Sequence, residues 1–238
     1  MSYPSPNVSR LIEANMTRWL EREKLERKIE EEASRPKLGP YVVISRQCGA
    51  GGEEIAASLS EHLGWDLADR EILDNIASDF QVSKQLVDFV DEKHVAWLTG
   101  LFEAWLEGQA FSQPGYIRDL GELLMIAAQH GNFVMVGRGS QFILPRDYGL
   151  FVRLHAPVEY RIQRMMESQG LLDDEAHGLV DKTDQERTRF LREYFRNDGT
   201  GPELYDLVID TSRFAPESVV DMVSIALKSR HFPAAACN

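Results

Sequence analysis

Residues 41–63 read YVVISRQCGAGGEEIAASLSEHL, in which a strand, a glycine-rich loop and a helix are expected to follow one another. The opening YVVIS is a short run rich in β-branched residues, a composition typical of a strand. Gln47 to Gly52 then bring three glycines into six residues. Apolar residues recur at helical spacing from Ile55 to Leu63. The stretch therefore predicts a strand that leads through a glycine loop into a helix.

Three more strands are predicted by short apolar runs further along the chain. They are Phe133–Val136, Leu150–Leu154 and Leu207–Ile209, and helical patterns separate each from the next. Because alternating strands and helices are typical of a parallel sheet with helices on both faces, we expect an α/β fold. The stretch from Asp69 to Gln129 reads as mostly helical and is too long for one crossover. We expect it to build a small helical subdomain over the sheet.

The first forty residues have a pattern of their own. From Val8 to Ala33 the apolar residues fall on one helical face, and the stretch from Glu21 to Glu32 is highly charged. Two prolines and a glycine within residues 36–40 then end the helix. We expect a charged amphipathic helix with its linker over residues 1–39, a globular domain over 40–230 and a tail over 231–238.

The apolar face of this helix needs a partner, because burying each such side chain is worth roughly 1.5–3 kcal/mol. Its residues are Leu11, Ile12, Met16, Trp19 and Leu20. The helix could fold back on its own domain, or it could pair with a second copy of the chain. The short linker and the charged stretch favour the second arrangement, so we expect a homodimer through this helix.

Composition excludes several classes of protein. Lys and Arg number 26 and Asp and Glu number 38, which gives 26 − 38 = −12, so most of the surface would repel a nucleic acid. No apolar run approaches the ~20 residues that cross a bilayer, and the first residues do not resemble a signal peptide. Two cysteines are too few for a disulfide framework or a zinc site. We expect a cytoplasmic protein that binds neither nucleic acid nor membrane.

The glycine loop is the first candidate site. Small residues let backbone N–H groups converge on an anion, and the helix that follows adds its positive N-terminal end, so a phosphate is the expected ligand. The alternative is a glycine turn that only packs the helix against the strand. The usual phosphate-binding loop reads G-x-x-x-x-G-K-[ST], whereas Gly52, Glu53 and Glu54 stand here where Lys and the hydroxyl would be.

Arginines provide the second signal. Nine of them lie between residues 138 and 196, a region with a single lysine, and arginine is favoured where phosphate is bound through two hydrogen bonds. Arg161 and Arg164 share a helical face, and Arg138 follows a predicted strand between two glycines, where α/β sheets bind ligands. The alternative for each is a surface ion pair.

Several stretches together resemble the cytidylate-kinase-like family of the nucleoside monophosphate kinase group. They are VVISRQCGAGGEEIAASLSEHLGW, LADREIL, FVMVGRGSQFILP, LFVRLHAPVEYRIQRM, DKTDQERTRFLREYF and YDLVIDTSRFAPESVVDMV, in family order. The resemblance implies a P-loop kinase core with a mobile helical lid. It also implies binding of ATP, Mg²⁺ and a nucleoside monophosphate, with transfer of the γ-phosphoryl group between the two nucleotides.

The resemblance also implies roles for single residues. The loop Cys48, Gly49, Ala50, Gly51, Gly52 and Glu53 would bind the donor phosphates, and Arg46, Arg138, Arg161, Arg164 and Arg187 would be catalytic. Asp69, Arg70, Arg138 and Asp184 would bind the substrate. Cytidylate kinases have aspartates on both sides of the Gly-Arg pair, where this chain has Val136 and Gly139.

Two functions remain open from the sequence. In the first, arginines replace the missing lysine and the protein is a phosphotransferase, with Asp69, Glu53 or Glu54 near the metal. Asp69 could equally cap a helix, and the metal ligands stay unassigned. In the second, the protein is a catalytically impaired nucleotide-binding or scaffolding module on the same fold.

Overall fold

A computed structural model of the chain describes residues 38–68, 120–121, 124–125, 127–137 and 139–232. They all belong to one compact unit that spans residues 37–238. The expected N-terminal helix and most of the expected helical subdomain lie outside the described residues, so both stay predictions from the sequence.

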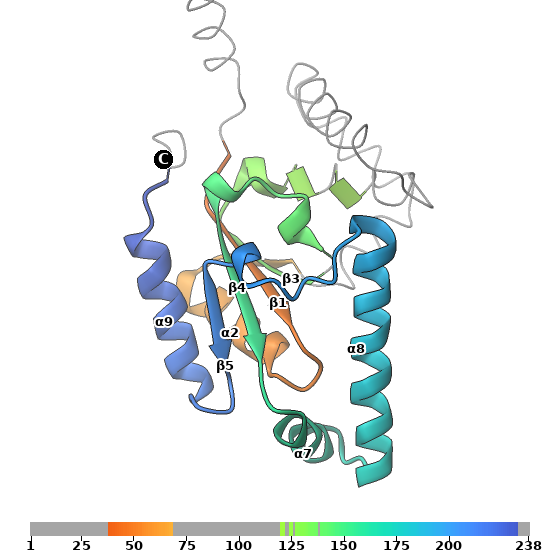
Figure 1. Ribbon diagram of the computed structural model, residues 1–238. Helices are drawn as coiled ribbons and strands as arrows, with labels where there is room; N and C mark the ends of the chain where they lie inside the picture. Colours follow the sequence, from red (N-terminus) through yellow and green to blue (C-terminus); the bar gives the residue numbers. More distant parts are fainter. Residues whose placement is uncertain (1–37, 69–119, 122–123, 126, 138, 233–238) are drawn as a thin grey trace, which may run out of the picture. The chain divides into compact units, whose positions relative to one another are not determined.

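Five parallel strands form one sheet in the order β2-β3-β1-β4-β5 (Figure 1). They are β1 (Tyr41–Arg46), β2 (Asp66–Ala68), β3 (Phe133–Val136), β4 (Gly149–His155) and β5 (Leu207–Asp210). In the register of the sheet, Tyr41 lies between Phe133 and Gly149. All four predicted strands are present, and β2 is an addition that the sequence did not signal.

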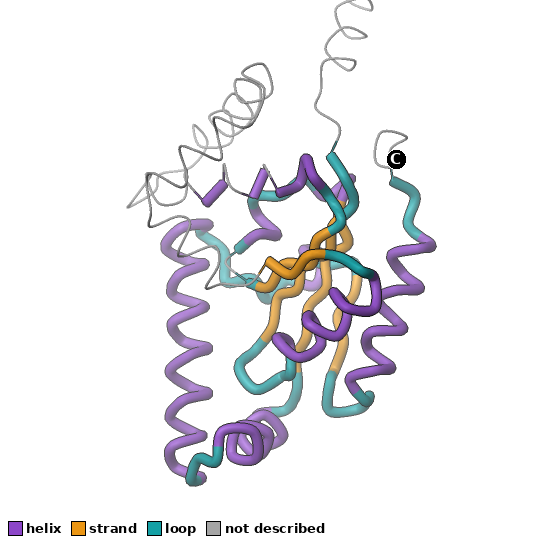
Figure 2. Tube along the Cα trace, turned by 180° about the vertical axis from the view of Figure 1, so that it is seen from behind, coloured by secondary structure: helices purple, strands orange, loops and turns teal. Residues whose placement is uncertain are grey.

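Helices cover both faces of this sheet. The helices whose bounds are described are α2 (Gly52–Leu63), α7 (Val158–Gln169), α8 (Asp173–Phe195) and α9 (Pro216–Ser229), with 3₁₀ turns η1 (Ser140–Phe142), η2 (Arg146–Tyr148) and η3 (Pro202–Leu204). α2 and α9 pack on the face that carries Val42 and Ile44, and α2 crosses in front of the strands in Figure 2. The other face carries Tyr41 and Val43 and is covered by helical residues within 120–130. The predicted α/β architecture is confirmed.

Helices α7 and α8 form a hairpin beyond the carboxyl end of β4 (Figure 1). Gly170, in the left-handed region at φ 68°, ends α7 and lets the chain turn back into α8. Ile162 and Met165 of α7 pack against Ala176 and Val180 of α8. The hairpin carries Arg161 and Arg164 on α7 and Asp184 and Arg187 on α8, which are residues of the predicted site.

The globular unit already begins to pack at Leu38. That residue is 1% exposed in the core, and the N–H of Gly39 donates to Ala128 O at 2.8 Å. The described packing therefore starts inside the segment that the sequence analysis assigned to the linker. At the other end, Phe232 packs against the core beyond α9. None of the described helices is long and apolar enough to cross a membrane.

Candidate functional site

The glycine loop joins β1 to α2 at the carboxyl edge of the sheet. Gly49 and Gly51 have φ values of 76° and 75°, in the left-handed region that side chains disfavour. A Cβ at Gly49 would also lie 2.5 Å from the carbonyl oxygen of Arg161. Both the backbone conformation and the close approach of α7 therefore require glycine in this loop.

Backbone N–H groups of this loop are available to a ligand. Within the described part of the chain, those of Gly49, Gly51, Gly52 and Glu54 have no hydrogen-bond partner, and no side chain caps α2. Unpaired amides at a helix N-terminus favour an anion. The loop thus has the geometry expected of a phosphate cradle.

Arg46 fills the space beside the loop where the usual lysine would project. Its side chain is only 8% exposed. A Cβ on Gly52 would lie 2.6 Å from Arg46 Cγ, and a Cβ on Gly137 would lie 2.3 Å from Arg46 Nη1. Arg46 therefore lies across two glycines and places a guanidinium between the loop and β3.

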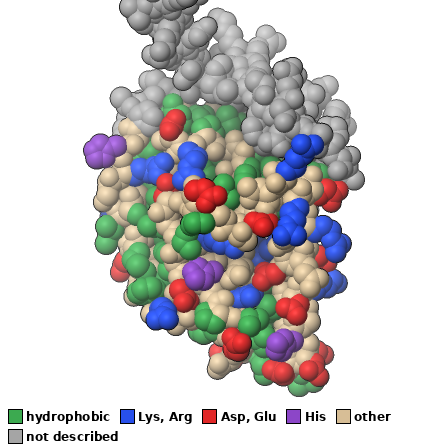
Figure 3. All heavy atoms as spheres, in the orientation of Figure 1, with side chains coloured by type: hydrophobic (Ala, Val, Ile, Leu, Met, Phe, Trp, Pro, Cys, Tyr) green, Lys and Arg blue, Asp and Glu red, His purple; other side chains and the backbone are tan. Residues whose placement is uncertain are grey.

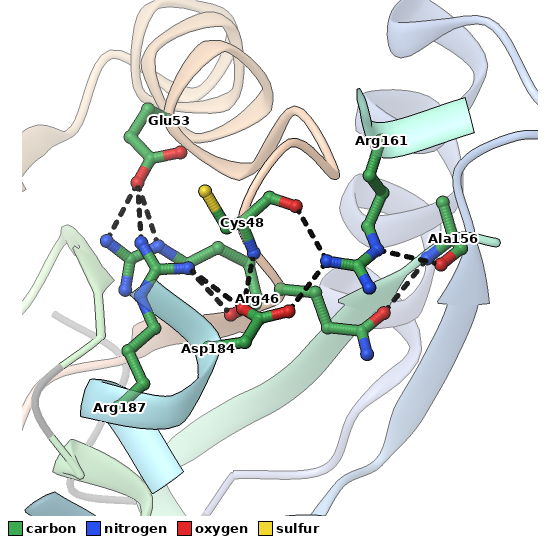
Figure 4. Close-up of polar contacts among 8 residues, drawn as sticks. Arg46, Cys48, Glu53, Ala156, Arg161, Asp184 and Arg187 are labelled. Atoms are coloured by element: carbon green, nitrogen blue, oxygen red, sulfur yellow. Dashed lines mark hydrogen bonds and ion pairs between the residues drawn. The ribbon is translucent and has the colours of Figure 1, made fainter. Parts of the chain in front are cut away.

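Glu53 binds two of the arginines that the sequence assigned to catalysis (Figure 4). Its Oε1 accepts from Arg46 Nε at 2.9 Å and Nη2 at 2.7 Å, and Arg187 Nη2 lies 3.6 Å away. Partial burial by itself would raise the pKa of Glu53, but the charges of Arg46 and Arg187 outweigh it and lower that pKa. Burial and the nearby charge of Arg46 lower the pKa of Arg187. Two neighbouring guanidiniums thus share one carboxylate.

Asp184 and Arg161 connect the helical hairpin to the loop (Figure 4). Asp184 Oδ1 accepts from the Cys48 N–H at 2.9 Å, and Oδ2 accepts from Arg161 Nη1 at 2.6 Å. Arg161 also donates to the carbonyl oxygens of Cys48 and Ala156, each at 3.0 Å. These contacts engage the guanidinium of Arg161, so in this arrangement it positions the loop.

Arg164 and Cys48 are also bonded to residues of the chain itself. Arg164 forms an ion pair with Glu54 and lies against Gly51. Burial raises the pKa of the Cys48 thiol, so Cys48 is a packed side chain whose N–H is already bonded to Asp184. Among the described residues, no group of three His, Cys, Asp or Glu side chains could hold a metal.

A cavity of about 290 Å³ adjoins the loop and lies between the sheet and α8. Arg46 and Gln47 from β1 and the loop line it, together with Gly137 and Gly139 after β3. Its other lining residues include Gln141, Arg153, Asp184, Arg187, Phe190 and Thr200. Gln141, Phe190 and Thr200 were not predicted as site residues, although Gln141 and Phe190 lie within stretches that carry the family resemblance.

The structure therefore brings together most of the predicted site. Arg46, Arg161, Arg164, Asp184 and Arg187 all surround the glycine loop. Three predicted residues, Asp69, Arg70 and Arg138, lie outside the described residues. On the face shown in Figure 3, basic and acidic side chains are interspersed over α8 rather than gathered into a basic surface.

The sequence profile of the cytidylate kinase-like family matches residues 41–213. The chain belongs to this family. It is 25% identical to the cytidylate kinase of Pyrococcus horikoshii over 193 residues, which cover 81% of this chain and 90% of that protein. It is 23% identical to the cytidylate kinase of Halobacterium salinarum over 184 residues, which cover 76% and 86%.

A solved structure shares the same fold. The crystal structure of an uncharacterized protein from Eubacterium ventriosum superposes with a TM-score of 0.61 at 22% identity and covers 80% of this chain and 98% of that one. As a cytidylate kinase-like protein, the chain has the α/β core of a P-loop kinase. Membership of the family supports phosphoryl transfer by a kinase as the class of activity.

Proposed function

We propose that the protein transfers the γ-phosphoryl group of ATP to a nucleoside monophosphate or a similar small acceptor that bears a phosphate. The observation that carries the proposal is the position of the cavity beside the glycine loop, with Arg46 between them. A donor phosphate on the loop amides and an acceptor in the cavity would face each other across this arginine. Kinases of this family are the relatives that the chain resembles.

In the reaction, an oxygen of the acceptor phosphate attacks the γ-phosphorus, and the bond from that phosphorus to the β-phosphate oxygen breaks. The protein has to align the two groups and neutralise the charge on the transferred phosphoryl group. The loop amides bind the donor phosphates, and Arg46 and Arg187 supply positive charge from the cavity wall. Mg²⁺ bound to the nucleotide supplies further neutralisation. Glu53 must release the two arginines before they can bind phosphate.

Measuring ADP release with ATP, Mg²⁺ and each common nucleoside monophosphate tests this function. We expect ADP to form only when an acceptor is present. Replacing Arg187 with alanine should lower kcat about 100-fold, because its charge acts on the transferred group. Lys228→Ala, at the exposed last turn of α9, should match the wild type. No ADP release with any acceptor, or full activity of Arg187→Ala, would contradict the proposal.

One observation favours nucleotide binding without transfer as the second candidate. Arg46, Arg161 and Arg164 are each paired with a carboxylate of the chain itself. If these pairs persist with nucleotide bound, the arginines cannot neutralise the transferred group. Calorimetry with ATP would then detect binding while the ADP assay stays at background, and that combination selects the second candidate.

Arg138 is proposed to bind the acceptor phosphate, as the family resemblance implies. Arg138→Ala should raise the KM for the acceptor or abolish turnover while leaving the KM for ATP unchanged. A fall in ATP affinity alone would contradict this role. We also infer, from the sequence alone, that the segment 8–33 pairs two copies of the chain.

A further inference from the structure

Three arginines of the described residues line the cavity, and carboxylates of the chain itself engage only two of them. Arg46 and Arg187 both lie within ion-pair distance of Glu53. Arg153, the third, comes from β4 and is half-buried. No carboxylate of the described residues lies within ion-pair distance of its guanidinium. Arg153 therefore brings to the cavity a positive charge that the described part of the chain does not pair.

The guanidinium of Arg153 is held through one of its nitrogens. Its Nη1 donates to Gly199 O at 2.5 Å, and the guanidinium lies 5.6 Å from the centre of the Tyr205 ring. Its Nε and Nη2 have no hydrogen-bond partner among the described residues, and neither atom is buried. These two nitrogens form the edge of a guanidinium that can bind an oxyanion through two parallel hydrogen bonds. That edge of Arg153 is free.

Arg46 shows which kind of group this edge binds. Its Nε and Nη2 donate to the Glu53 carboxylate at 2.9 and 2.7 Å (Figure 4). Arg153 presents the same pair of donors, but no carboxylate of the described residues faces them. Asp198 also lines the cavity, yet its carboxylate accepts from Thr200 at 2.6 Å and from Arg192 at 3.4 Å. A negatively charged group of a ligand therefore matches the free edge of Arg153.

Arg46 and Arg153 serve different parts of the cavity. Arg46 lies against Gly137, directly after β3, because a Cβ on Gly137 would lie 2.3 Å from Arg46 Nη1. Arg153 stands on β4, and β1 separates β4 from β3 in the sheet. Two strand spacings amount to roughly 10 Å, which is more than one phosphate group spans. A group bound to Arg153 is therefore distinct from a phosphate bound to Arg46.

We propose that Arg153 binds a second anionic group of the acceptor, a carboxylate or a phosphate, in addition to the phosphate that receives the transferred group. Either group offers oxygens to Nε and Nη2, as Glu53 does to Arg46. An acceptor without this group leaves the free edge of Arg153 to water and binds less tightly. The cavity thus favours acceptors with two separate anionic groups over simple nucleoside monophosphates. The inference rests on the proposed function, because it describes the acceptor of that site.

Calorimetric titration of the full chain with nucleotides that differ by one anionic group tests the inference without requiring turnover. Orotidine 5′-monophosphate differs from UMP by a carboxylate on the base, and adenosine 3′,5′-bisphosphate differs from AMP by a second phosphate. We expect at least one of these doubly anionic nucleotides to bind about tenfold or more tightly than its partner, as expected for one charge-assisted contact. The pair that shows the difference tells a carboxylate from a phosphate.

Variants of Arg153 assign the difference to this residue. Arg153→Met removes the charge but keeps an apolar side chain beside Tyr205, so the affinity ratio within the pair should fall to about one. Arg153→Lys keeps the charge without the planar edge, so the ratio should fall several-fold. If Arg153→Met does not fold, Arg153→Lys decides alone. Lys228→Met removes one positive charge from the exposed last turn of α9 and should leave the ratio unchanged.

The outcomes distinguish this inference from the proposed function. If nucleoside monophosphates bind and are phosphorylated but the second anionic group brings no gain in either pair, the role of Arg153 is wrong and the kinase stands. A ratio that persists in Arg153→Met leads to the same conclusion. If the gain is present and depends on Arg153 but no nucleotide is phosphorylated, the binding site stands and phosphoryl transfer fails. If none of the four nucleotides binds, both fail.

Discussion

Arg46 occupies the space into which a side chain on Gly52 would project. A Cβ on Gly52 would lie 2.6 Å from Cγ and 2.7 Å from Cβ of Arg46. Both atoms are close to the backbone of Arg46. Arg46 therefore cannot avoid a side chain at position 52 by moving only the end of its own side chain. Position 52 usually holds a lysine and here holds glycine. Arginine at position 46 and glycine at position 52 therefore depend on each other.

The first prediction follows from this shared space. Gly52→Ala should displace the Arg46 side chain and lower phosphoryl transfer about tenfold or more, through loss of one charge-assisted contact. Gly178→Ala on α8 is the matched control, since nothing lies within 4 Å of its added Cβ. The double variant Arg46→Gly with Gly52→Lys should recover activity relative to Arg46→Gly alone. If Gly52→Ala equals the wild type, Arg46 does not replace the lysine.

The second prediction concerns Glu53, whose side chain is 66% exposed while it holds the more buried Arg46 and Arg187. Glu53→Gln removes the competing negative charge, so the protein should bind tripolyphosphate about tenfold more tightly, as expected for one exchanged ion contact. Glu61→Gln, exposed on the same helix, is the control. Calorimetry gives both dissociation constants.

The pH dependence of that effect has a defined sign. Because the arginines lower the pKa of Glu53, its carboxylate stays ionised until the pH falls below the ordinary range of glutamate. The contact between Glu53 and the arginines is therefore present at neutral pH and is lost only in acid. The affinity ratio of Glu53→Gln to wild type should be constant between about pH 6 and pH 8. A ratio that changes steeply across this interval would contradict the assignment.

Strand positions were predictable because each strand is a local apolar run bounded by turn residues. The runs at Phe133 and at Leu150 are examples, and both are strands in the structure. β2 was missed because Asp66–Ala68 has only three residues, and it becomes a strand by pairing with β3 rather than by its own propensity.

The site was predictable only in part, because its partners are distant in the sequence. The resemblance gave Arg164 a catalytic role, but nothing local to it indicates an ion pair with Glu54, 110 residues away. Arg161 was predicted to be catalytic, but nothing local to it indicates that its guanidinium donates to Cys48 O, 113 residues away. Gln141 likewise contacts Tyr205, which follows it by 64 residues.

The third prediction tests the role of the N-terminal segment, which lies outside the described residues. Deleting residues 1–36 keeps Leu38, which is 1% exposed in the core, so the remaining chain should fold. If the segment 8–33 pairs two copies, the molar mass from light scattering should fall from that of a dimer to that of a monomer. Full-length chain that is already monomeric at micromolar concentration, or an unchanged dimer after deletion, would exclude this pairing.

The fourth prediction concerns Gly139, which stands where the family resemblance leads one to expect aspartate. Gly139 has φ 72°, and a Cβ there would lie 2.3 Å from Cε2 of Phe195. Gly170 has nearly the same φ, 68°, but nothing lies within 4 Å of its added Cβ. Gly170→Ala should therefore cost only the left-handed backbone strain, about 1–2 kcal/mol. Gly139→Ala should cost that strain and the displacement of the aromatic ring.

Urea unfolding of both variants measures the two costs separately. We expect Gly139→Ala to lose at least about 1 kcal/mol more than Gly170→Ala, because inserting an extra carbon into a packed site is destabilising. In a Phe195→Leu background the ring atoms that meet the new Cβ are gone, so Gly139→Ala should become less costly while Gly170→Ala should not change. Equal losses for the two glycines, or strict additivity of Gly139→Ala with Phe195→Leu, would show that Phe195 is not the reason for glycine at this position.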